Sequence, residues 1–208
     1  MVYSFKRTDS PSHAIIIEKG WNILNILIRR LPQRGEILSV FGVVVFAVHS
    51  WSVRGFLYQA PAYSLYYSIG EMFFVFSYMM AFALLESVLI TLLLVVPAVI
   101  LPSKLLKEGF AYKGFLAVLV ASAYSIWLQN TLGNLPPPSS LLLNNAGIAV
   151  GAFVLLAILF QLVGFLQKIV INLAERMGIM AYLYVPLGLI GILVFISRSL
   201  FHLIQRLI

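Results

Sequence analysis

Long apolar runs separated by short polar connectors dominate the pattern of this chain. A helix needs about 20 mostly apolar residues to cross a hydrocarbon core of about 30 Å. Runs of this kind recur along the sequence, so the pattern predicts an all-α integral membrane protein with about five transmembrane helices. We expect the spans at residues 37–56, 68–101, 114–129, 146–166 and 179–196.

The run at 68–101 is longer than one crossing requires. At a rise of 1.5 Å per residue, a single helix over this range is about 50 Å long and must tilt, bend or project from the bilayer. A hairpin of two short helices is the alternative, but no Gly, Asn or Pro cluster marks a turn between Met80 and Ser87. The sequence therefore favours one helix, with Pro97 as a kink point.

Both ends of the chain show amphipathic helical periodicity. Residues 11–31 place apolar side chains on one face and charged or amide side chains opposite, which is typical of a helix lying in the membrane interface. Packing of that face on a neighbouring protein is an equal alternative. From Ser197 onward the helical period persists, so we expect an amphipathic C-terminal helical tail.

These features divide the chain into two parts. Residues 1–34 form a cytoplasmic N-terminal segment with the interfacial helix, and residues 35–208 form a single transmembrane helical bundle. The stretch before Ser12 lacks the apolar run and cleavage site of a signal peptide, so we expect it to be retained.

The distribution of basic residues predicts the orientation. With a cytoplasmic N-terminus, eleven of the 14 Lys and Arg residues fall on the cytoplasmic side, which leaves Arg54, Arg198 and Arg206 opposite. A hairpin in place of the long second span would reduce this bias to eight against six. We therefore expect five spans and a C-terminus on the opposite side, in a membrane of the bacterial cytoplasmic type.

Composition and charge agree with this class. Apolar residues make up 62% of the chain and charged residues 10%, against about 45–50% and about 25% in soluble domains. The net charge of +7 comes mostly from basic residues that flank apolar runs, where they attract anionic headgroups, so nucleic acid is not an expected partner. The lack of cysteine excludes disulfides, thiolate metal sites and thiol nucleophiles.

Glu86 lies near the centre of the long second span. An isolated carboxylate at that depth costs at least a few kcal/mol, so we expect it to face protein or water, to be protonated, or both. Helical geometry places Glu71, Tyr78 and Phe82 on the same broad face as Glu86. We expect this face to meet other helices.

His49 lies about midway along the first span, which runs antiparallel to the second. We hypothesise that His49 and Glu86 contact each other, directly or through water. The pair is either a hydrogen-bonded strut that fixes helix packing or part of a proton or ion pathway. The strut is favoured because spans three to five offer almost no further polar groups. Glu71, Gln161 and Arg54 are accessory polar candidates.

Small residues mark sites of close helix contact. Gly147 and Gly151 form a G-x-x-x-G motif at the start of span four, and Gly188 and Gly191 open a groove in span five. Glycine lets helix backbones approach closely in membranes, so these four residues predict helix packing.

Motifs for catalysis or metal binding are missing from the sequence. It lacks paired aspartates for Mg²⁺, H-E-x-x-H, G-x-S-x-G and a phosphate-binding glycine loop. Its three histidines are scattered, so we predict no metal site and no catalytic residue. We predict no cofactor, although a bound lipid fits so apolar a surface.

Three functions are compatible with these observations. The favoured one is a non-catalytic integral membrane subunit or scaffold that packs with partner proteins or lipids in a larger membrane assembly, because intramembrane polar groups are few and loops are short. The partners are then membrane lipids and either other membrane-protein subunits or further copies of the chain. A small transporter or a proton- or ion-conducting protein using Glu86 and His49 is the alternative, and a lipid-modifying membrane enzyme is third.

Overall fold

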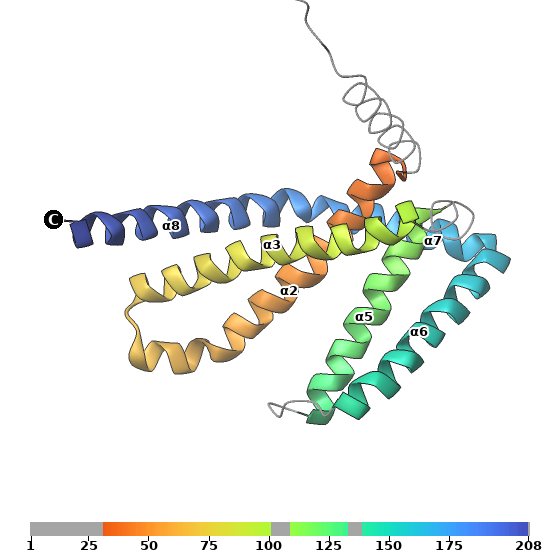
Figure 1. Ribbon diagram of the computed structural model, residues 1–208, viewed down its shortest axis with the longest axis horizontal. Coiled ribbons are helices and arrows are strands. Elements are labelled where there is room, and N and C mark those ends of the chain that lie inside the picture. The colour runs from red at the N-terminus through yellow and green to blue at the C-terminus, as the bar shows by residue number, and fades with distance from the viewer. Residues whose placement is uncertain (1–30, 101–108, 133–138, 208) are drawn as a thin grey trace, which may run out of the picture.

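The computed structural model describes residues 31–100, 109–132 and 139–207 of the chain (Figure 1). These residues form six helices and no strand. The bounds are Arg34–Tyr66 for α2, Ile69–Ile100 for α3, Phe110–Leu132 for α5, Ser139–Leu162 for α6, Gly164–Ile179 for α7 and Ala181–Leu207 for α8.

Five of the helices are long and apolar enough to cross a membrane: α2, α3, α5, α6 over Asn145–Leu162, and α8 over Ala181–Phe201. The predicted all-helical class with five spans is confirmed at this level. The interfacial helix expected at residues 11–31 lies outside the described residues. The C-terminal tail is helical as far as Leu207, as the continuation of α8.

Helix α3 settles the alternative between one long span and a hairpin. It is a single helix of 32 residues without a turn between Met80 and Ser87, which corresponds to a length of about 48 Å. Its buried hydroxyl groups are satisfied locally. The side chains of Ser77, Ser87 and Thr91 each donate a hydrogen bond to the carbonyl four residues earlier, at 2.9, 2.6 and 2.8 Å respectively. Small polar residues are thus compatible with a buried apolar helix face.

Helix α2 is longer than the first predicted span. It continues through Pro61 to Tyr66, ten residues beyond the expected end of the first span at residue 56. Pro61 cannot donate the intrahelical hydrogen bond of its position, which bends a helix without necessarily ending it. Figure 1 shows α2 changing direction in its C-terminal half.

Helix α7 was not predicted. The fourth span ends at Leu162, and Val163 with φ of −109° and ψ of 85° interrupts the helix before Gly164. The expected boundary at residue 166 is therefore about one turn too late. Helix α7 buries Val170 and Ala174, while Glu175 and Arg176 are exposed. It was missed because such an amphipathic helix contains no long apolar run.

The helices form two groups that diverge from a common region (Figure 1). Helices α2, α3 and α8 pack along one another, and we name this group the α2–α3–α8 bundle. Helices α5 and α6 form an antiparallel pair, the α5–α6 hairpin. The two groups meet near α7 in a buried core, which comprises Val40, Val43, Val44, Ala98, Phe110, Tyr112, Phe115, Leu116, Val118, Val170 and Ala174.

Glycine permits the closest approaches in this core. A Cβ atom on Gly42 of α2 would lie 2.5 Å from the Cα atom of Gly178 in α7. A Cβ atom on Gly114 of α5 would lie 2.5 Å from a methyl group of Val40 in α2. Both distances are too short for any larger residue, so these contacts fix how α5 and α7 dock on α2.

Candidate functional site

His49 is fully buried inside the α2–α3–α8 bundle. Its Nδ1 atom lies 3.0 Å from the carbonyl oxygen of Val45, and because a carbonyl can only accept, Nδ1 carries the proton of this hydrogen bond. The ring stacks on Tyr184 of α8 with centroids 5.1 Å apart. The Nε2 atom is buried and has no hydrogen-bond partner among residues 31–100, 109–132 and 139–207. His49 therefore joins α2 to α8 by ring packing.

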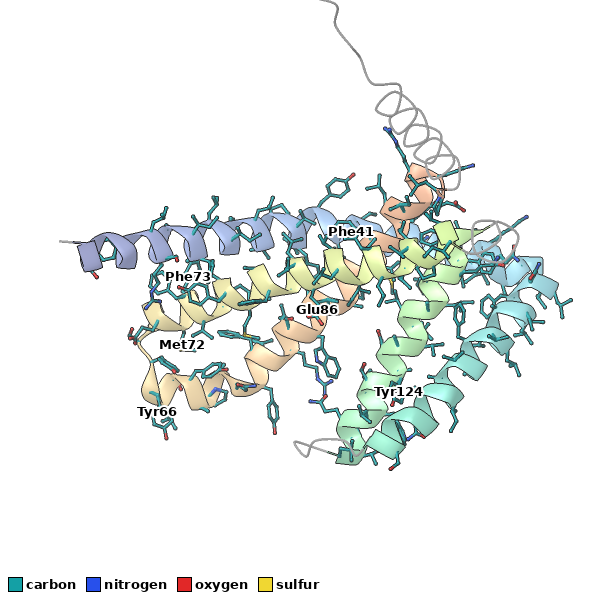
Figure 2. All side chains as sticks on the ribbon, in the orientation of Figure 1. Phe41, Tyr66, Met72, Phe73, Glu86 and Tyr124 are labelled. Atoms are coloured by element: carbon teal, nitrogen blue, oxygen red, sulfur yellow. The ribbon has the colours of Figure 1, made fainter. Side chains whose placement is uncertain are left out.

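Glu86 lies on the exposed surface of α3 (Figure 2). It is two residues, or about 200° of helix rotation, from Leu84, and Leu84 packs against Gly188 of α8. The carboxyl group therefore points away from α8. Among the described residues, none forms a hydrogen bond or an ion pair with the carboxyl group of Glu86.

The relative positions of His49 and Glu86, for which we hypothesise a contact, follow from the register of α2 and α3. The packing of Phe56 against Phe76, with ring centroids 5.1 Å apart, sets the antiparallel register of α2 and α3. In that register His49 is level with Ala83, which is only about 5 Å along the axis from Glu86.

The two side chains share a depth but differ in direction. His49 points into the bundle and Glu86 points out of it. A direct hydrogen bond between them is absent from the described residues, because Nδ1 of His49 is bonded to Val45 and Nε2 has no partner. A link through water stays a prediction.

The face of α3 that carries Glu86 was expected to meet other helices. Within the described part of the chain it is largely open, with Phe82 61% exposed. Tyr78 is the exception, since its ring packs edge-on against Phe195 of α8 with centroids 5.7 Å apart. The reason is the position of α8, which packs on the opposite side of α3, around Ser77, Ala81 and Leu84.

The accessory polar residues lie apart from one another. Glu71 accepts hydrogen bonds from the backbone N–H and the hydroxyl of Ser68, at 2.8 and 2.9 Å, at the start of α3. The guanidinium of Arg54 lies 5.1 Å from the ring centroid of Trp51 on α2. Gln161 is exposed on α6. Each of these residues has a local environment of its own, and they do not gather around Glu86 or His49.

The four predicted packing glycines fall into two environments. A Cβ atom on Gly188 would lie 2.7 Å from Cβ of Leu84, and one on Gly191 would overlap the backbone carbonyl of Ser77. These two glycines let α8 approach α3 closely. For Gly147 and Gly151 of α6, no atom of the described residues lies within 4 Å of the position of an added Cβ.

Several residues of this arrangement were missed by the sequence analysis. Gly42 and Gly114 make contacts like those of Gly188, and their place in apolar runs was the available signal. Tyr184 had no sequence signal as the partner of His49, because only the fold brings α8 against α2. The hydroxyl of Tyr124 on α5 is the other buried polar atom without a partner among the described residues.

No group of three or more His, Cys, Asp or Glu residues that could hold a metal ion occurs in the described ranges. The fold and the polar residues together define a class: a helical membrane protein whose intramembrane polar groups are separated rather than convergent. Comparisons with protein-family models, curated proteins and solved structures find no match for this chain.

Proposed function

We propose that this protein is a non-catalytic integral membrane subunit that packs with partner chains in a larger membrane assembly. One observation carries the proposal: none of the 18-residue spanning window of α6, Asn145–Leu162, is buried within the described part of the chain. Each of the other spanning windows has a buried share. Helix α6 is thus the span that the described residues cover least.

Helix α6 has two distinct sides, one packed toward the core and one exposed. Phe153, Leu156 and Phe160 are partly buried and pack toward the shared core. The opposite side, which we name the glycine face, consists of Gly147, Gly151, Val154 and Ile158. Gly151 is two residues, or about 200°, from Phe153, so the glycine face points away from α5.

Lipid alone satisfies an ordinary apolar helix face, because acyl chains are as apolar as leucine. The glycine face differs, since its two glycines leave a strip of backbone open to close approach. Helix association in membranes gains mainly from such close van der Waals packing. The glycine face is therefore suited to close packing against a helix of a partner chain.

The geometry of His49 and Glu86 favours this proposal over an ion pathway. A pathway requires polar groups that can pass a proton or ion from one to the next. In this chain His49 points into a packed interior and Glu86 points outward, so the two groups serve different surfaces.

Native mass spectrometry of the full-length chain, released from its membrane in a gentle detergent, tests the proposal. We expect the wild-type protein in a complex of defined mass, and we expect Gly151→Leu to release the chain from it. Gly70→Leu is the matched control, because Gly70 also has no atom within 4 Å of an added Cβ but lies at the start of α3. A wild-type chain that runs alone, or a complex that survives Gly151→Leu, contradicts the proposal.

A further inference from the structure

The exposed carboxyl group of Glu86 is not stabilised by lipid acyl chains, in contrast to the exposed apolar side chains of α3. Leucine and phenylalanine side chains on a spanning helix are satisfied by acyl chains. A carboxylate near the middle of a span is not, since its ionised form costs several kcal/mol in hydrocarbon unless it is paired. Glu86 is 17 residues from Ile69 and 14 from Ile100, so it lies near the middle of α3.

Glu86 belongs to a continuous exposed seam along α3. Successive members are separated by four, three, four, three and four residues, which is the spacing at which one helix packs along another. A single polar residue in such a seam fixes the register of the two helices. The members of this seam are Phe82, Glu86, Leu89, Leu93, Val96 and Ile100, all of which are exposed.

Arg54 and Arg198, two described arginines of the bundle, lie too far along α3 to neutralise Glu86. In the register set by Phe56 and Phe76, Arg54 is level with Tyr78, eight residues or about 12 Å from Glu86. Arg54 lies over Trp51 instead. Arg198 lies over the ring of Phe74, at 5.0 Å from its centroid, which is about 18 Å along α3 from Glu86.

A second copy of the chain that packs seam to seam in parallel does not supply the missing charge through Arg54. In a parallel pair related by an axis along the membrane normal, every residue keeps its depth. Glu86 would then meet another Glu86, and two like charges at close range repel. Arg54 of the second copy would be about 12 Å away in depth, as in the first. In this arrangement the second copy brings none of the described arginines of the bundle to the depth of Glu86, which favours a different chain as the source of the complementary group.

We infer that the seam from Phe82 to Ile100 binds a transmembrane helix of a different protein that presents a Lys or Arg side chain at the depth of Glu86. This inference rests on the proposed function, because it names a partner of the membrane subunit, but it concerns α3 and not the glycine face of α6. The ion pair neutralises the carboxylate, and the apolar members of the seam provide the packing surface.

The experiment uses the purified full-length protein in phosphatidylcholine vesicles and synthetic transmembrane peptides as partners. One peptide is a leucine–alanine helix with a single central Lys, the second has Leu at that position, and the third has the Lys moved eight residues toward one end. Energy transfer between labelled peptide and labelled protein reports association. We expect about tenfold tighter association of the central-Lys peptide than of the other two, the size of a polar helix–helix contact in a membrane.

Two variants make the test specific. Glu86→Leu is expected to remove the tenfold difference, and because residue 86 is exposed, leucine there leaves the fold intact. Glu71→Gln is the matched control at an exposed carboxyl group of the same helix, and it is expected to retain the difference. Thermal unfolding of both variants in detergent confirms that they are folded.

Equal association of the all-leucine and central-Lys peptides overturns the inference, as does a gain that survives Glu86→Leu. Self-association of the chain that requires Glu86 in the absence of peptide also overturns it, in favour of a second copy as occupant. These outcomes are independent of the native mass measurement, which concerns α6. If the native complex depends on Gly151 but all peptides associate equally with the protein, the inference about α3 is refuted and the proposed function is retained.

Discussion

The α2–α3–α8 bundle and the α5–α6 hairpin are both built from helices apolar enough to cross a membrane, but they pack these helices differently. In the bundle His49, Met80 and Ser87 are fully buried, and Gly188 and Gly191 allow α8 to approach α3 closely. In the hairpin none of the spanning window of α6 is buried. The difference teaches that apolar character places a helix in the membrane, whereas small residues at matched positions decide which of its sides is covered by protein.

The largest expected effect comes from a glycine of the bundle. Gly191→Leu places a side chain on the backbone carbonyl of Ser77, and we expect a loss of about 3 kcal/mol in the free energy of unfolding. Gly151→Leu in the hairpin is the comparison, and it should leave that free energy unchanged because the site is open. Unfolding in a titration with sodium dodecyl sulfate measures both, and equal losses would break the distinction between the two regions.

A second prediction concerns His49 as a packing residue of the bundle. His49→Ala removes the ring that stacks on Tyr184 and should cost about 2–3 kcal/mol through the cavity it leaves. His49→Phe keeps a ring and removes the unpartnered Nε2 atom, so its stability should stay within about 1.5 kcal/mol of wild type. Unfolding in the sodium dodecyl sulfate titration measures the free energy of unfolding of both variants. If phenylalanine is as damaging as alanine, the ring is needed for its nitrogen atoms and the packing role is wrong.

The smallest expected effect compares two serines with the same local hydrogen bond. Ser87 is fully buried in the bundle, while Ser125 is exposed in the hairpin and donates to the carbonyl of Ala121 at 2.9 Å. Ser87→Ala should cost about 0.5–1 kcal/mol, because buried packing is altered. Ser125→Ala should change the free energy of unfolding by less than about 0.5 kcal/mol. A larger loss at Ser125 would indicate that α5 is covered more than this structure shows.

The position of a residue along its helix was predictable from sequence, whereas the direction of its side chain around the helix was not. The five spans and the single long α3 followed from apolar length and from the lack of turn residues between Met80 and Ser87. The shared depth of His49 and Glu86 followed from counting residues. The opposite directions of these two side chains could not be predicted, because they depend on which sides of α3 pack against α2 and α8.

The glycines illustrate the same limit. Two pairs of glycines gave the same kind of signal in the sequence. Gly188 and Gly191 contact α3, whereas Gly147 and Gly151 face open space in the described part of the chain. A motif of small residues states that close approach is possible but does not name the neighbour. Helix α7 was missed for a different reason, since its buried side chains are few and its polar side chains are many.

The most direct test of the account is a photo-crosslinking measurement in intact membranes. A photoreactive phenylalanine analogue replaces Ile158 on the glycine face of α6 or, as the matched control, Phe160 on the side that packs toward the core. We predict that position 158 forms a crosslink to another polypeptide, that Gly151→Leu abolishes this crosslink, and that position 160 forms crosslinks within the chain. Crosslinks from position 158 to lipid only would contradict the account, because the face proposed for a partner would then be covered by the bilayer.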